Sequence, residues 1–110
     1  MPQSILQSRK ECYLCRELLF VQNTSGLQLH HIFPGSRRQM SDKTGCVCWL
    51  CREHHTGQHG VHQSRALALW LMQRCQQVYT ERSGQEDFMR KFGKDFLSIS
   101  IAGLETEDIL

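Results

Sequence analysis

Residues 45–62 read GCVCWLCREHHTGQHGVH and contain three of the six cysteines and four of the six histidines of the 110-residue chain. Thiolates and imidazoles are the usual protein ligands of zinc, so this segment predicts a metal site. An even number of cysteines in a short chain also fits a disulfide scaffold. The crowding of the thiols and their interleaving with histidines favour metal ligands over disulfides.

A closed zinc site can be assembled from two short motifs. Cys12 and Cys15 form a C-x2-C knuckle, in which two thiolates from one turn bind the same ion. His54 follows Cys51 by one helical turn, so this pair can supply the other two ligands. Cys48 and Cys51 form a second C-x2-C, and a four-cysteine site is the alternative. A structural zinc would add folding free energy to a domain with a small core.

The remaining histidines indicate a second metal site. Adjacent residues of a short helix lie about 100° apart around its axis, so His54 and His55 are expected to serve different sites. His55 and His59 have the i, i+4 spacing at which two imidazoles can hold one ion. A third ligand could come from His30 or His31, which point to opposite faces of a regular strand.

The hydrophobic pattern predicts a small α+β fold. Strands at residues 17–21 and 27–33 are expected to form a hairpin across the turn-forming residues 23–26. Residues 34–45 show no periodicity and are expected to form an exposed basic loop. The other expected elements are a strand at 47–50, a short helix at 51–59, a long helix at 64–82, and a helix that follows the capping box Ser83-Gly84-Gln85-Glu86 and ends near Gly93.

One domain is expected to cover the whole chain, because 110 residues leave room for no more. Its expected parts are a metal-binding core at 12–62, a helical extension at 63–97 and a flexible tail at 98–110. Trp70 and Cys75 are interpreted as core residues of the long helix. His62 is interpreted as a surface, capping or core-edge residue outside both predicted sites.

The order of these motifs resembles the HNH endonucleases, also called His-Me finger or ββα-metal nucleases, in their zinc-stabilised treble-clef form. The resemblance rests on the C-x2-C at residues 12–15, on L-H-H-I at residues 29–32 and on L-C-x2-H-H-x3-H at residues 50–59. It includes the paired histidines and the H-x3-H of the colicin-type DNases. More loosely, residues 86–94 resemble small HNH-like proteins of phages and prophages. The resemblance implies a treble-clef ββα-metal unit followed by two C-terminal helices.

By this resemblance the protein is expected to be a metal-dependent endonuclease that hydrolyses DNA phosphodiester bonds. His31 matches the general base, and an imidazole can take the proton of an attacking water near neutral pH. The catalytic divalent ion, such as Mg2+, Mn2+, Ni2+ or Zn2+, would be held by His30, His55 and His59. The closed structural Zn2+ site keeps its own ligands, Cys12, Cys15, Cys51 and His54.

The basic residues lie mainly in the part of the chain that carries the motifs. Through Arg65 there are 8 Lys and Arg against 4 Asp and Glu, and from Ala66 onward there are 5 against 7, which accounts for the totals of 13 and 11. The formal net charge of +2 is too small to establish a nucleic-acid partner. DNA binding through phosphates is expected from Arg37, Arg38, Lys43 and Arg52.

One position departs from the family pattern. The family's middle Asn, which helps to hold the base or binds the metal, falls at Cys46, and the chain has no Asn after Asn23. A thiol cannot supply the paired donor and acceptor of an amide. Three interpretations follow: the loop holds His31 in another way, Cys46 acts as a ligand, or the protein is a zinc-finger module that binds nucleic acid or a protein without turnover. A purely structural zinc domain of a phage assembly is a further alternative.

No stretch of the sequence approaches the roughly 20 apolar residues that a bilayer span requires. The first ten residues, MPQSILQSRK, lack the apolar segment of a secretion signal. With 40% hydrophobic and 22% charged residues, the chain is expected to be soluble and cytoplasmic, without a membrane partner. A bacterial or phage source is implied by the resemblance alone.

Overall fold

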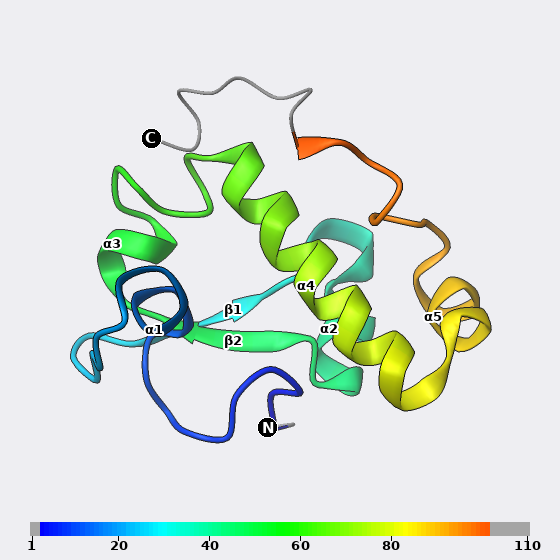
Figure 1. Ribbon diagram of the computed structural model, residues 1–110, viewed down its shortest axis with the longest axis horizontal. Coiled ribbons are helices and arrows are strands. Elements are labelled where there is room, and N and C mark those ends of the chain that lie inside the picture. The colour runs from blue at the N-terminus through cyan, green and yellow to red at the C-terminus, as the bar shows by residue number, and fades with distance from the viewer. Residues whose placement is uncertain (1–2, 102–110) are drawn as a thin grey trace.

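A two-stranded antiparallel sheet lies near the centre of the molecule (Figure 1). The computed structural model describes residues 3–101, and within them strand β1 (Gln28–His31) pairs with β2 (Val47–Leu50). The register places His30 opposite Cys48. The predicted strand at 47–50 is confirmed, whereas the expected hairpin between residues 17–21 and 27–33 is wrong, because β1 pairs with the later strand.

Helix α1 (Tyr13–Leu19) occupies most of the segment that was expected to be the first strand. Cys12 caps this helix, since its Sγ accepts the backbone N–H of Cys15. The helix ends at Phe20, which adopts the left-handed conformation with φ of 58°. The cap from the Cys12 side chain therefore starts a helix here, although the apolar residues that follow favour a strand.

Helix α2 (Arg38–Thr44), preceded by a 3-10 turn (Gly35–Arg37), replaces the basic loop expected at residues 34–45. Ser41 is its one buried residue. The Ser41 hydroxyl donates to the carbonyl of Cys46 and accepts the N–H of Phe33, so α2 is tied to both strand ends. The contacts that hold α2 are largely polar, from Ser41 and from Asp42 to His31, and such contacts leave no apolar periodicity, which explains why the sequence pattern did not predict this helix.

Three further helices complete the described fold: α3 (Arg52–His55), α4 (Arg65–Ser83) and α5 (Gln85–Phe92). The Ser64 hydroxyl caps α4 by accepting the N–H of Leu67. Gly93 ends α5 in the left-handed conformation, as predicted. The capping box is wrong, because Ser83 is the last residue of α4 and α5 begins after Gly84 without a side-chain cap.

The core gathers buried residues of α1, β2, α4 and α5, and α5 packs beside α4 (Figure 1). The Phe33 ring contacts the rings of Phe88, Phe92 and Phe96, with centroids 5.6, 4.6 and 5.0 Å away. Cys75 is fully buried, as expected for a core residue, and Trp70 is partly buried. These contacts fix the C-terminal helices on the unit that contains the cysteines and histidines.

Contacts from the middle of α4 attach two further regions to this core. Arg74 of α4 donates to the hydroxyl of Tyr13 at 3.2 Å and pairs with Glu17, so α4 holds α1. Gln73 donates to the carbonyls of Phe96 and Ile99. The start of the expected flexible tail, residues 98–101, is therefore held against α4, and the rest of that tail lies outside the described residues. Among residues 3–101, none of the helices is long and apolar enough to cross a membrane.

Candidate metal centres

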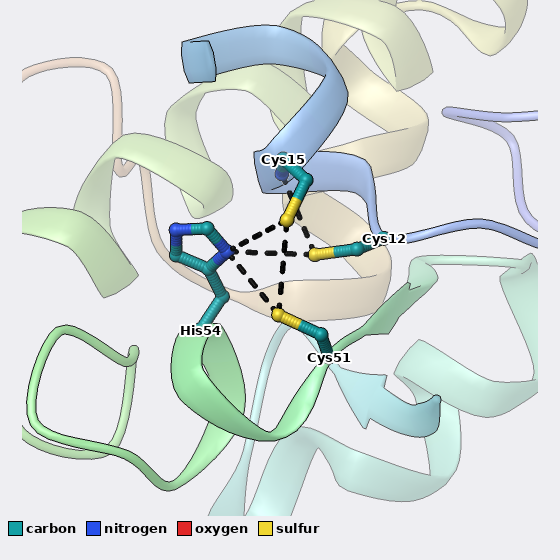
Figure 2. Close-up of side chains that lie close together, drawn as sticks. All are labelled: Cys12, Cys15, Cys51 and His54. Atoms are coloured by element: carbon teal, nitrogen blue, oxygen red, sulfur yellow. Dashed lines mark hydrogen bonds between the residues drawn. The ribbon is translucent and has the colours of Figure 1, made fainter. Parts of the chain in front are cut away.

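The first candidate centre joins the two motifs predicted to share one ion. Cys12 and Cys15 come from the beginning of α1, Cys51 lies between β2 and α3, and His54 lies in α3. Figure 2 shows the three sulfurs and the His54 ring converging on one point. All four residues are buried, and together they form a group able to hold a metal ion.

The spacing of the ligand atoms fits zinc. The Nδ1 atom of His54 lies 3.6 Å from Cys12 Sγ, 3.4 Å from Cys15 Sγ and 3.5 Å from Cys51 Sγ. The Cys15 and Cys51 sulfurs are 3.8 Å apart. A tetrahedral zinc with ordinary bond lengths separates its ligands by roughly 3.8 Å between sulfurs and roughly 3.6 Å between sulfur and nitrogen. The cluster can therefore bind a zinc ion without rearrangement.

The surroundings of these ligands also suit a cation. Burial raises the pKa of the Cys15 thiol to about 12, so a thiolate at this position needs a positive charge beside it at neutral pH. Burial lowers the pKa of His54, which favours the neutral ring that ligates metals. The Asn23 side-chain amide donates to Cys15 Sγ at 3.6 Å, an outer hydrogen bond that the sequence reasoning did not predict.

Cys48, the alternative fourth ligand, is not a member of this group. It is fully buried in β2, and burial raises the pKa of its thiol well above the ordinary range. His54 occupies the fourth position, as the first of the two sequence interpretations predicted.

The second candidate centre consists of His30, His55 and His62. The ring centroids of His30 lie 5.4 Å from His55 and 5.6 Å from His62, and those of His55 and His62 are 4.6 Å apart. The Nε2 atoms of His55 and His62 are separated by 3.1 Å. Burial, aided by the two neighbouring rings, lowers the pKa of His30 to about 3, so this imidazole is neutral at physiological pH.

His59 lies apart from these three histidines, although its spacing from His55 suggested a shared ion. Its backbone N–H and its ring Nδ1 both face the Glu53 carboxylate, at 2.8 and 3.3 Å. The i, i+4 argument requires a helix through residue 59, and α3 ends at His55. The chain then turns back so that the N–H of His62 reaches the carbonyl of His55 at 3.1 Å.

Two glycines permit this return of the chain. A Cβ on Gly60 would stand 2.6 Å from the His55 carbonyl oxygen, and one on Gly57 would stand 2.7 Å from the Cα of Glu53. Only residues without a side chain fit such close approaches. These glycines are the signal in the sequence that the helix ends early. The turn that they allow brings His62, rather than His59, beside His55.

His31, the expected general base, forms a hydrogen-bonded pair with Asp42 of α2. Its Nε2 lies 3.1 Å from Asp42 Oδ1, and the His31 side chain is 18% exposed. The sequence reasoning missed Asp42, because α2 itself was not predicted. Cys46, at the position to which the resemblance assigns an Asn, is buried and hydrogen-bonds Cys75, an interaction that lowers the pKa of Cys46.

A cleft of about 440 Å³ connects the three-histidine group with His31. Its lining includes His30, His31, His55, His62 and Arg38. Both histidines of the strand therefore reach one cleft, although a regular strand would separate them, and His31 is the last residue of β1.

The four basic residues expected to contact DNA differ in their surroundings. Arg37 donates to the carbonyl of Phe92 at 2.8 Å and so holds α5 in place. Arg38 is exposed and lines the cleft. Lys43 and Arg52 are exposed on α2 and α3.

Comparison of the chain with protein-family models, with curated proteins and with solved structures finds no match in any of the three. The functional argument therefore rests on the geometry of the two centres.

Proposed function

We propose that this protein is a metal-dependent endonuclease of the HNH type, built on a zinc-supported treble-clef ββα unit, that hydrolyses DNA phosphodiester bonds. One observation carries the proposal: the three-histidine group and His31, which pairs with Asp42, line the same cleft. Three ligands leave a tetrahedral or larger coordination sphere open for water and substrate, as hydrolytic metal sites require.

In this proposal His31 takes the proton of the attacking water. The Asp42 carboxylate only accepts hydrogen bonds when ionised, so it holds a proton on His31 Nε2 and leaves Nδ1 as the basic nitrogen. The same carboxylate stabilises the imidazolium after proton transfer. Asp42 thereby orients His31, a role that the resemblance assigned to an Asn at position 46.

The divalent ion is assigned to His30, His55 and His62. A bound ion would stabilise the charge that develops on the phosphate and on the leaving oxygen. Arg38, which lines the cleft, and Lys43, which is exposed on α2, would bind neighbouring phosphates. Such contacts give affinity that depends on salt and carries little sequence preference.

The test is cleavage of a plasmid by the purified protein with Mg2+, Mn2+, Ni2+, Co2+ or Zn2+, with zinc content measured in parallel. His31→Ala is expected to lower cleavage at least 100-fold, since a positioned base contributes about 10²–10⁴. His59→Ala removes an exposed histidine outside the group and is expected to retain the wild-type rate. Cleavage that persists in His31→Ala, with one zinc bound per chain, would rule out this role of His31.

A second function, a zinc module that binds a protein partner without turnover, is favoured by one separate feature. An apolar groove of about 500 Å³, lined by residues that include Leu18, Leu19, Leu67 and Trp70, lies beside the zinc ligand His54. The adjacent Phe20 is 85% exposed. Absence of cleavage with every ion, together with a single bound zinc, would favour this second function.

A further inference from the structure

We infer that Gln28 is a positioning residue for the three-histidine group, because it selects the ring tautomer in which His55 Nε2 is free to bind a metal ion. The inference rests on the proposed function in one respect, that His30, His55 and His62 are metal ligands. It does not depend on which reaction the ion supports.

The hydrogen bond between Gln28 and His55 defines the tautomer. The Gln28 side-chain oxygen lies 2.6 Å from His55 Nδ1. An amide oxygen can only accept, so Nδ1 carries the proton. A neutral imidazole has one protonated nitrogen, and Nε2 of His55 is therefore left with its lone pair.

That lone pair points into the group. His55 Nε2 lies 3.1 Å from His62 Nε2, and one ligand atom from each of the three rings lies within 4.8 Å of the others. If His55 carried its proton on Nε2, a hydrogen would occupy the space where an ion must sit. Gln28 thus disfavours the Nε2–H tautomer of His55 before an ion binds. This is the usual effect of a hydrogen-bond acceptor on the far nitrogen of a metal-bound histidine.

The arrangement depends on two residues of one strand, Gln28 and His30. Gln28 begins β1 and lies two residues before His30, so the two side chains leave the strand on the same face. Helix α3, which carries His55, packs against β1. One strand therefore supplies a candidate ligand and also the group that orients the ligand from the neighbouring helix.

The experiment uses protein that retains its structural zinc, with nitrogen NMR of the imidazoles and titration with Ni2+ alone. In wild-type protein without Ni2+, His55 is expected to be the Nδ1–H tautomer. Gln28→Leu is expected to shift His55 toward the Nε2–H tautomer and to weaken Ni2+ binding about 10–100-fold. Gln28→Glu, which keeps an acceptor, is expected to retain the tautomer and the binding.

The matched control is Gln77→Leu, the same change at an exposed position on α4. It is expected to alter neither the tautomer nor Ni2+ binding. The inference is overturned if wild-type His55 is protonated on Nε2, if Gln28→Leu binds Ni2+ as tightly as wild type, or if wild type binds no ion beyond the structural zinc. Ni2+ binding that weakens in Gln28→Leu as expected, without DNA cleavage by the wild-type protein, would support the inference while removing the proposed nuclease function.

Discussion

The adjacent residues His54 and His55 belong to different candidate metal centres. His54 faces the three cysteines, whereas its neighbour His55 faces His30 and His62. The separation follows from the angle between adjacent helical residues. The i, i+4 spacing gave the wrong expectation for His59. It assumed that the helix continues beyond His55, where Gly57 and Gly60 interrupt it.

Substitution of His62 tests the composition of the second group. His62→Ala is expected to weaken binding of a second ion, measured by Ni2+ titration of zinc-containing protein, at least tenfold, because one of three ligands is lost. His59→Ala is the matched control, and its expected affinity is that of wild type. If His59→Ala weakened Ni2+ binding and His62→Ala did not, His59 would be the third ligand.

Asp42 is expected to act on catalysis through His31. Asp42→Asn keeps the size of the side chain and loses the charge that stabilises a protonated ring. Plasmid cleavage is expected to fall about tenfold or more, with Ni2+ affinity and zinc content unchanged. An equal loss of metal binding would instead indicate that Asp42 supports the local structure.

Among the elements, the turn after α3 determines where the second group can form. The N–H of Val61 donates to the carbonyl of His54, and the N–H of His62 to that of His55, so the returning chain runs against the helix. Gly60 lies at the closest approach and is buried. A seven-residue separation between His55 and His62 is thereby converted into direct contact.

Gly60→Ala is expected to destabilise the fold by about 1–3 kcal/mol, because the added methyl group meets the His55 carbonyl oxygen. Binding of the second ion is expected to weaken as well. Denaturant unfolding and Ni2+ titration measure the two effects. Gln58→Ala, an exposed change in the same turn, is the control, and equal unfolding midpoints for the two variants would contradict the role given to Gly60.

The junction between α4 and α5 contains a pH-sensitive contact. Hydrogen bonds from Tyr79 and Lys91 lower the pKa of Asp87 below its ordinary value, and Arg90 also pairs with it. A carboxyl group whose pKa is lowered by folding contributes stability above the pKa of the unfolded state. That contribution disappears as the pH falls through the lower folded pKa, below about 4.

Asp87→Asn is therefore expected to unfold more easily than wild type at pH 7, with a difference that shrinks as the pH falls below about 4. The free energy of unfolding measured for both proteins across this range gives the test. Glu86→Gln removes the same charge from the same helical turn without breaking these hydrogen bonds. A difference that stayed constant with pH would show that the ionised Asp87 is not the source.

At the level of the whole molecule, the four-residue cluster joins two segments that lie far apart in the sequence. Cys12 and Cys15 belong to α1, and Cys51 and His54 belong to the end of the β2–α3 segment. A bound zinc would cross-link these segments within the hydrophobic core, to which Cys12, Cys15 and Cys51 belong. Binding free energy of such an ion is folding free energy, because the unfolded chain has no preformed site.

Cys51→Ser is expected to lose the zinc and most of the helical circular dichroism signal. Cys48→Ser is the control, since Cys48 lies outside the cluster, and it is expected to keep one zinc per chain. Metal content by mass spectrometry under non-denaturing conditions distinguishes them. Loss of zinc from Cys48→Ser alone would favour the four-cysteine alternative.

The local features of this protein could be predicted from its sequence. Cys12 with Cys15, and Cys51 with His54, are each one turn apart, so backbone geometry alone brings each pair together. The Ser64 cap of α4 and the glycine end of α5 are likewise set by neighbours a few residues away.

The features that needed the folded chain are those that join distant segments through single polar contacts. Ser41 ties α2 to the strand ends, Asp42 of the same helix reaches His31, and Gln28 reaches His55 across 27 residues of chain. No periodicity records such contacts, because each depends on where two elements come to lie rather than on the order of residues within either one. Short-range geometry was therefore visible in the sequence, while the composition of the cleft emerged only when strand, helix and glycine turn packed together.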